Sequence, residues 1–350
     1  MSPPKATFLQ SLASGAFHLA LTVARVLLAV CGVLVGSLYR SVCRNMRLQR
    51  VEVKELSLPL LAARLTDLPY QVDTEEEIAA GINSLLNDPK LLHFQEQELM
   101  QTHAVWYLVE ANDPQSESER ALFLVFRGTK SPTDAIADIM FRPEAGPNGI
   151  RCHGGFLRTV MNDTNLLKTL QELPSDKSLY IMGHSLGGAL SQTIVGAGLL
   201  PATFTGRLTV VSLGGPVAFF GDLKLEMLPE VAAAARVLSI VNANDIVPRL
   251  LGCPLSFSRT VLKLFAANAS SRQQRRNEAI LDTLEKYVGF PQEELLFLHK
   301  KTVYSVQCCD RKSVLHLAEA LHPRAIADHL TYVKAMEDAA GAPHWCALTA

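Results

Sequence analysis

The feature that most constrains the fold is the pentapeptide Gly183–Gly187, which has the form G-x-S-x-G. It follows a buried strand-like run, Leu179–Met182, and it precedes a helix of small residues. A turn this tight between a strand and a helix requires glycine two residues before and two residues after the serine. The pattern therefore predicts a nucleophile elbow, with Gly183 and Gly187 as its turn glycines and the Ser185 hydroxyl raised over the end of a sheet.

Strand-like and helix-like segments alternate along the chain from residue 104 onward. The expected strands are Ala104–Ala111, Ala121–Phe126, Leu179–Met182, Leu208–Leu213, Val237–Val241 and Thr302–Gln307, and the expected helices are Phe156–Leu173, Gly188–Leu199 and Ser313–Leu321. The polar loop Asn112–Arg120 joins the first two strands as a hairpin. Alternation of this kind predicts an α/β fold with a mostly parallel central sheet flanked by helices. Residues 51–103 read as helix and loop, with Glu75–Glu77 opening an amphipathic helix.

The first fifty residues differ from the rest, because they hold six Lys or Arg and no Asp or Glu. The stretch Phe17–Leu38 is long enough to span a bilayer, and Arg44, Arg47 and Arg50 follow it. We expect residues 1–50 to be a membrane anchor or targeting segment, with the catalytic part on the cytosolic or stromal side. An organelle transit peptide and a cleaved secretory signal are the alternatives.

Composition excludes several classes of protein. The 350 residues are 48% hydrophobic and 19% charged, and the net charge is −1, so the chain is not intrinsically disordered. This balance gives no reason to expect a nucleic-acid partner. The seven cysteines are scattered and form no C-x-x-C pair, so neither a zinc site nor a disulfide framework is expected.

A serine nucleophile needs a histidine base and an acid that orients it. Asp245 follows the strand Val237–Val241, where the acid of such a sheet is expected. His329 follows the last strand and helix and is the favoured base, with His322 as the alternative. The backbone N–H of Leu186 and a donor from Thr129, in the loop after an early strand, are expected to bind the oxyanion.

Five motifs occur in an order and rough spacing that resemble the class 3 (fungal-type) lipases, and the resemblance runs from about residue 104 to 333. The motifs are Phe126–Thr129, His153–Phe156, Gly183–Gly188, Asn244–Arg249 and Asp328–Tyr332. The resemblance implies an α/β-hydrolase fold over 104–340, with Ser185 as nucleophile, Asp245 as acid and His329 as base. The sequence around Arg127–Pro132 looks most like diacylglycerol-lipase-like proteins and shares much with plastid-type glycerolipid lipases.

The same resemblance implies a short lid in the region 131–150. Ile136, Ile139 and Met140 lie at helical spacing and form its apolar face. Residues 253–300 are expected to be a helical insertion. Residues 51–103 are expected to be a helical extension before the lipase domain.

The activity implied is hydrolysis of acyl esters of glycerolipids, such as triacylglycerol, diacylglycerol or polar glycerolipids, at a membrane or lipid-droplet surface. No cofactor and no metal are implied. A serine esterase for another kind of ester and a catalytically silent lipid-binding protein are the alternatives. The sequence specifies neither the oligomeric state nor the head group.

Overall fold

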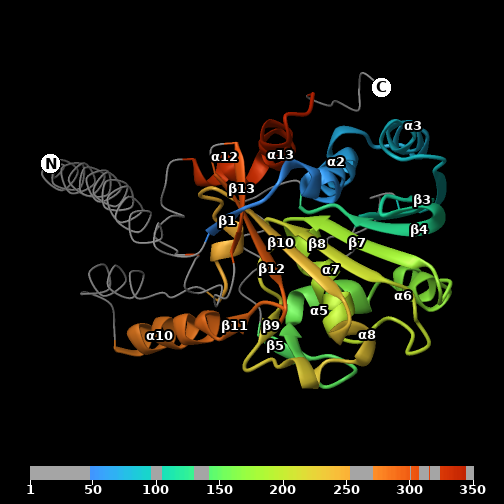
Figure 1. Ribbon diagram of the computed structural model, residues 1–350. Helices are drawn as coiled ribbons and strands as arrows, with labels where there is room; N and C mark the ends of the chain where they lie inside the picture. The colour runs from blue at the N-terminus through green and yellow to red at the C-terminus, as the bar shows by residue number, and fades with distance from the viewer. Residues whose placement is uncertain are drawn as a thin grey trace, which may run out of the picture.

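The computed structural model describes residues 48–95, 105–129, 142–252, 271–299, 301–306, 315 and 324–343. Within these ranges a nine-stranded sheet forms the centre of the molecule, in the order β1-β13-β12-β10-β8-β7-β4-β3-β2 (Figure 1). Its strands in chain order are β1 (Leu48–Arg50), β2 (Lys90–Phe94), β3 (Trp106–Asp113), β4 (Ser116–Phe126), β7 (Ser178–His184), β8 (Leu208–Leu213), β10 (Arg236–Asn242), β12 (Glu294–His299) and β13 (Thr302–Val306).

The middle of the sheet is parallel and its two edges are antiparallel. Strands β4, β7, β8, β10 and β12 pair in parallel, while β2, β3, β13 and β1 add antiparallel strands at the sides. The predicted mostly parallel sheet is therefore confirmed. Parallel neighbours carry their carboxyl ends to one edge, which brings the ends of β7 and β10 to the same side of the molecule.

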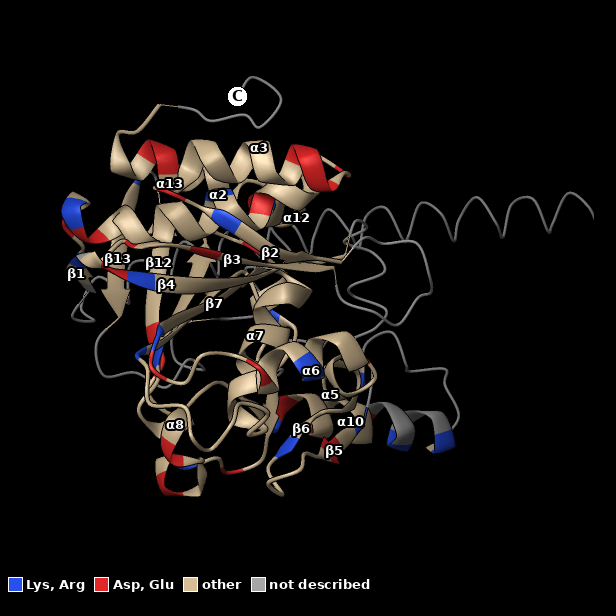
Figure 2. Ribbon diagram, turned by 90° about the vertical axis from the view of Figure 1, so that its right-hand side faces the viewer, with Lys and Arg blue, Asp and Glu red and all other residues tan. Residues whose placement is uncertain are grey.

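Helices cover both faces of the sheet, as Figures 1 and 2 show from two directions. On one face lie α2, α3, α12 and α13, and on the other lie α5, α6, α7 and α8. Residues of β4 alternate between the two cores, since Leu122 and Leu124 face α5 and α7 while Phe123 and Val125 face α2. The helices are α2 (Ser57–Gln71), α3 (Glu75–Leu85), α5 (Gly154–Met161), α6 (Thr164–Gln171), α7 (Leu186–Gly196), α8 (Glu230–Ala233), α10 (Ser271–Glu285), α12 (Ala325–Leu330) and α13 (Tyr332–Ala340), with short 3-10 turns at Val53–Leu56, Leu225–Met227 and Val247–Arg249.

The expected single helix Phe156–Leu173 is two helices, α5 and α6. The break falls at Asp163, whose side chain caps α6 by accepting a hydrogen bond from the Leu166 N–H at 2.9 Å. The same carboxylate accepts the indole N–H of Trp106 at 2.9 Å. Aspartate is a strong N-cap residue, so it starts a new helix rather than continuing the old one. The expected helix Gly188–Leu199 is present as α7, and Ser313–Leu321 lies outside the described residues apart from Leu315.

The hairpin loop Asn112–Arg120 was predicted too long. Strand β3 continues to Asp113 and β4 begins at Ser116, with those two residues paired across a short turn. The hairpin extends past the sheet into solvent, and Ser118 and Glu119 are exposed. Polar residues on a strand that meets water do not mark a loop, which is why composition misplaced the boundary.

The N-terminal extension is helical, as expected, but it also adds an edge strand. Thr74 and Glu77 form a capping box at the start of α3, and Glu77 is the last residue of the acidic run expected there. Strand β2 then pairs with β3, so Lys90–Phe94 adds a strand that the expectation of mostly helix and loop over 51–103 did not name. Five residues with no clean alternation of apolar and polar side chains carry too weak a signal for a strand.

The segment predicted as a helical insertion contains the helix α10, but its end belongs to the main sheet. Strand β12 pairs in parallel with β10 and antiparallel with β13, so residues 294–299 are part of the core. A smaller sheet below the main one, in the order β11-β9-β6-β5, was not expected. Its strands are β5 (Pro143–Ala145), β6 (Arg151–His153), β9 (Phe219–Phe220) and β11 (Tyr287–Val288).

The cap at Asp163 gives a test of the fold. Asp163→Ala removes the α6 cap and leaves the buried Trp106 N–H without its acceptor, so we expect a loss of about 2–4 kcal/mol in the free energy of unfolding. Denaturant titration measures this loss. Glu172→Ala, which removes an exposed acid from the other end of the same helix, is the control and changes stability by less than about 0.5 kcal/mol. Equal losses in the two variants would contradict the account.

Candidate active site

Ser185 occupies the sharp turn between β7, which ends at His184, and α7, which begins at Leu186. Its backbone has φ 56° and ψ −124°, a conformation that costs a non-glycine residue roughly 1–3 kcal/mol. A side chain on Gly183 would overlap the backbone of Gly187, and a side chain on Gly187 would lie 2.5 Å from the Phe126 carbonyl oxygen. The two glycines that the sequence predicted are therefore the ones that let the turn form against β4.

His329 and Asp245 form a buried pair. His329 lies on α12 and Asp245 follows β10, and the imidazole Nδ1 lies 3.0 Å from both carboxylate oxygens. The carboxylate accepts, so Nδ1 carries the proton and donates it. This tautomer leaves Nε2 as the basic nitrogen, which is the arrangement that a general base for a serine requires.

Two further groups hold the Asp245 carboxylate. The Tyr332 hydroxyl donates to Oδ2 at 2.7 Å, and the Val247 N–H donates to Oδ1 at 2.9 Å. Burial, and secondarily the nearby carboxylate, raise the pKa of Tyr332 well above its usual value, so the hydroxyl stays protonated. The Asn242 N–H in turn donates to the Tyr332 oxygen at 2.9 Å. A carboxylate with this many donors can stay charged in a buried place.

Hydrogen bonds also join the loop of the acid to the helix of the base. The Asp328 carboxylate accepts from the backbone and the side-chain N–H groups of Asn244, each at 3.0 Å. The Asn242 amide donates to the Asp328 carbonyl at 2.7 Å. Arg249, fully buried, donates to the carbonyl of Asp245 and, at 2.7 Å, to that of Ala243. These contacts fix the separation of Asp245 and His329, although the two residues come from distant parts of the chain.

His184, the residue before the nucleophile, brings His329 to the elbow. Its Nε2 donates to the His329 carbonyl at 2.9 Å, and the two rings lie 4.7 Å apart. Its Nδ1 lies 3.1 Å from the Tyr70 hydroxyl. Burial, followed by the charge of a protonated His329, lowers the pKa of His184 to about 3. His184 is therefore neutral at ordinary pH and binds its neighbours as a dipole rather than as a cation.

The loop after β4 lies directly against the nucleophile. A side chain on Gly128 would come within 2.8 Å of the Ser185 Cβ. The next residue, Thr129, has a buried hydroxyl with no hydrogen-bond partner among the described residues. The Leu186 N–H opens α7, where helix geometry leaves it without an acceptor. Thr129 and Leu186 are therefore the two donors near Ser185 that a developing oxyanion would meet.

The structure brings Ser185, Asp245, His329, Thr129 and Leu186 into one site from four separate places in the sequence, since Ser185 and Leu186 are neighbours. The lid residues Ile136, Ile139 and Met140 and the alternative base His322 lie outside the described residues. Sequence reasoning missed Tyr332, His184 and Tyr70. The first two lie inside motifs that were identified, next to predicted residues. Nothing in the sequence pointed to Tyr70.

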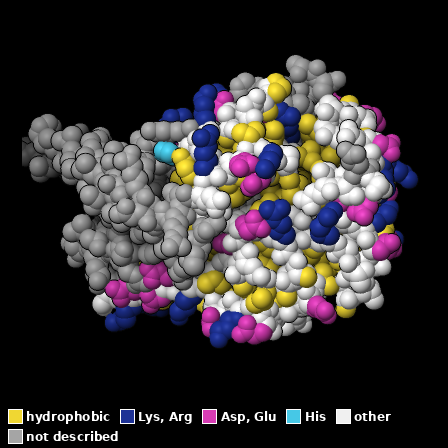
Figure 3. Space-filling view, viewed as in Figure 1, with side chains coloured by type: hydrophobic (Ala, Val, Ile, Leu, Met, Phe, Trp, Pro, Cys, Tyr) yellow, Lys and Arg dark blue, Asp and Glu magenta, His cyan; other side chains and the backbone are white. Residues whose placement is uncertain are grey.

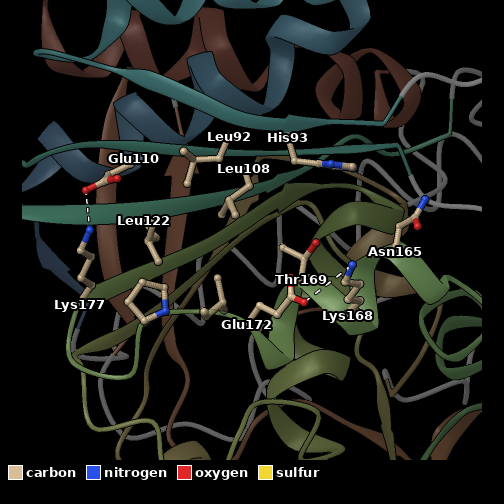
Figure 4. Close-up of a pocket in the computed structure, with 12 residues that line it drawn as sticks. Leu92, His93, Leu108, Glu110, Leu122, Asn165, Lys168, Thr169, Glu172 and Lys177 are labelled. Carbon is tan, nitrogen blue, oxygen red and sulfur yellow. Dashed lines mark hydrogen bonds and ion pairs between the residues drawn. The ribbon is translucent and has the colours of Figure 1, made fainter.

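No group of three His, Cys, Asp or Glu side chains that could hold a metal ion occurs within the described ranges. A cavity of about 430 Å³ lies between α6 and strands β2 to β4 (Figure 4). Leu92, Leu108 and Leu122 line its middle, and the ion pair Glu110–Lys177 closes one end. Lys177 immediately precedes β7, whereas Ser185 follows it, so this cavity lies at the end of the strand opposite to the site.

The comparisons with known proteins agree with this geometry. A sequence model of the lipase (class 3) family matches residues 123–255. The lipase of Rhizomucor miehei is 37% identical over 90 residues, which cover 24% of this chain and 24% of the relative. The lipase of Rhizopus oryzae is 35% identical over 112 residues, covering 29% of this chain and 28% of the relative. The matched segments thus span only about a quarter of the length of these curated relatives.

Solved structures extend the match in fold to most of the chain. The nonglycosylated Yarrowia lipolytica LIP2 lipase superposes with a TM-score of 0.55 at 16% identity, covering 83% of this chain and 97% of that one. A fungal lipase in complex with an inhibitor gives a TM-score of 0.52 at 19% identity, covering 84% and 98%. At these identities the likeness concerns the fold.

The sheet, the elbow and the buried histidine–aspartate pair define the α/β-hydrolase class. Within this class, the five motifs and the matches above place the chain more narrowly. Over residues 123–255 the chain is similar to the class 3 lipase family. The predicted fold is confirmed, and the match over residues 123–255 supports the predicted family. The narrower likeness to diacylglycerol-lipase-like or plastid-type members stays a prediction.

The neutral His184 predicts how stability changes with pH. Its pKa is about 3 in the folded chain, against 6.5 for an ordinary histidine. Between these values only the unfolded chain binds the proton, so acidification favours unfolding, by at most about 1.4 kcal/mol per pH unit. This contribution is fully present above pH 6.5 and is lost as the pH falls toward 3. His184→Gln cannot titrate, so its unfolding free energy falls less between pH 6.5 and 5.5 than that of the wild type. Parallel slopes in the two proteins would refute the prediction.

Proposed function

We propose that the protein is a serine-dependent lipase that hydrolyses acyl esters of glycerolipids. The observation that carries the proposal is the strained elbow at Ser185, which lies beside the buried His329–Asp245 pair. The elbow is held against a loop whose Thr129 hydroxyl has no hydrogen-bond partner in the described part of the chain. Strain of this kind persists where surrounding contacts fix it, and it is typical of catalytic serines. The match of residues 123–255 to the lipase (class 3) family supports glycerolipid esters as the substrate class.

In the first half of the proposed cycle, His329 Nε2 takes the proton of Ser185 as Oγ attacks the ester carbonyl carbon. The carbonyl π bond opens and its electrons move to the oxygen, which the donors of Thr129 and Leu186 bind. The imidazolium then gives its proton to the alcohol oxygen as the carbon–oxygen bond breaks. The alcohol leaves, and the acyl group stays on Ser185 as an ester.

In the second half, water replaces the alcohol. His329 takes a proton from the water as the water oxygen attacks the acyl carbon. The second tetrahedral intermediate then collapses: the bond between the acyl carbon and Ser185 Oγ breaks, the imidazolium returns its proton to Oγ, and the fatty acid leaves. Asp245 keeps the Nδ1 proton in place throughout and stabilises the imidazolium. Each oxyanion donor contributes about 3–4 kcal/mol to lowering the barrier.

The proposed place of action is a membrane or lipid-droplet surface, with the catalytic part on the cytosolic or stromal side and an organelle as the alternative. Support comes from the apolar and basic composition of residues 1–50, which lie outside the described part. No helix of the described ranges is long and apolar enough to cross a membrane. On the face shown in Figure 3, acidic and basic side chains are interspersed with apolar ones.

Lipid profiling of mixed liposomes tests the proposal. The full chain is incubated with vesicles of diacylglycerol, triacylglycerol, phospholipid and galactolipid, and the products are measured by mass spectrometry. We expect fatty acid release that falls by at least about 1,000-fold in Ser185→Ala, because the remaining donors cannot replace a nucleophile. The lipid that is depleted identifies the head group.

Ser57→Ala, an exposed serine at the start of α2, is the matched control and should release fatty acid like the wild type. Equal release by the wild type and Ser185→Ala would contradict the proposal. Hydrolysis of soluble esters without any release from liposomes would indicate an esterase for another kind of substrate. A chain with neither activity would indicate the silent lipid-binding alternative.

A further inference from the structure

The last turn of α2 reaches the catalytic site from a segment that the sequence places before the hydrolase domain. We propose that Tyr70 is a positioning residue whose single hydroxyl holds the nucleophile elbow, the oxyanion loop and the helix of the base in register. The inference rests on the proposed function and names a residue that this function requires. The helical extension is then part of the catalytic machinery rather than a spacer.

The direction of the hydrogen bonds follows from the groups involved. The His329 carbonyl can only accept, so His184 Nε2, 2.9 Å away, carries the proton. The neutral ring then has a bare Nδ1, which accepts from the Tyr70 hydroxyl at 3.1 Å. A chain of donors therefore runs from Tyr70 through His184 to the backbone of the base. It sets the ring of His184 and, through it, the place of His329 beside Ser185.

The same hydroxyl contacts the oxyanion loop. The Gly128 backbone packs closely against this hydroxyl, since a side chain on Gly128 would lie 2.6 Å from the hydroxyl oxygen. One residue earlier, the buried Arg127 donates to the Pro69 carbonyl at 3.3 Å and lies 5.8 Å from the Tyr70 ring. The end of α2 thus anchors the loop that presents Thr129.

Strong contacts fix α2 itself, so it can serve as a reference for the site. Leu65 and Leu68 of the helix are fully buried in the hydrophobic core on this face of the sheet. Arg64 pairs with the buried Glu337 of α13 at 3.0 Å. Helix α13 follows α12 directly, so the same pair braces the helix that carries His329.

Tyr70 acts through other residues and not on the substrate. Its one proton is committed to His184, and the Gly128 backbone lies close against its oxygen. Burial raises the pKa of Tyr70 far above its usual value, so the hydroxyl remains a donor over the whole working range of pH. Loss of the hydroxyl should therefore change the alignment of the catalytic groups and leave substrate binding nearly intact.

Tyr70→Phe and Tyr107→Phe in the full chain form a matched pair. Each substitution removes one buried hydroxyl. The Tyr70 hydroxyl lies on α2 and contacts His184 beside the nucleophile, whereas the Tyr107 hydroxyl lies on β3 and donates to the Leu65 carbonyl of α2. We would measure kcat and KM on a soluble short-chain ester, the rate of labelling by a fluorophosphonate, and the melting temperature of each variant. We expect Tyr70→Phe to lower kcat and the labelling rate about tenfold with little change in KM. Tyr107→Phe should lower the melting temperature to a similar degree and keep kcat.

A second variant keeps the inference falsifiable if Tyr70→Phe folds poorly. His184→Gln should lower kcat in the same way, and adding Tyr70→Phe to it should cost less than the product of the two single effects, because both break one chain of hydrogen bonds. An active wild type whose kcat is unchanged in Tyr70→Phe, or is equally reduced in Tyr107→Phe, overturns the positioning role and leaves the hydrolase intact. A wild type that neither hydrolyses esters nor is labelled overturns the proposed function, and this inference with it.

Discussion

The rest of the site depends on the close contact between the turn at Ser185 and the backbone of β4. Glycine at 183 and 187 allows α7 to start immediately after β7, and the Phe126 carbonyl lies where a side chain on Gly187 would have to be. This contact sets the height of Ser185 over the sheet and brings Gly128 against it. Because neither backbone can move away without breaking the parallel pairing of β4 and β7, the strained conformation of the serine is held by the sheet itself.

Charge is kept in the site by a dense set of donors. Asp245 is fully buried, and it accepts from His329, Tyr332 and the backbone of Val247. Loss of one donor would leave a buried carboxylate oxygen without a hydrogen bond, which is unfavourable. The network therefore keeps both the acid and the base in fixed positions. On the other side of His329, the neutral His184 links the base to α2. The nucleophile, the base and the oxyanion loop are therefore held in place by elements on both faces of the sheet.

Much of this arrangement could be predicted from the sequence. The parts that could not be predicted were missed for a common reason. Ser185, Asp245 and His329 lie in short motifs at the ends of recognisable elements, so local pattern and strand order were sufficient to place them. Tyr70 could not be found, because its role arises only when α2 folds back over the sheet, and a tyrosine in an apolar helix looks like core. The split of the helix at Asp163 and the strand β12 were missed for a related reason, since one capping side chain and one short apolar run decide them.

The most direct test of the central claim is to map the site of phosphonylation. The full chain is treated with a fluorophosphonate, digested, and its peptides are sequenced by mass spectrometry. The account predicts a single adduct on Ser185, because among the serines that the structure describes only this one combines a strained turn, a neighbouring base and nearby oxyanion donors. An enzyme that hydrolyses esters while the Ser185 peptide stays unmodified, or that carries the adduct on another residue, would contradict it.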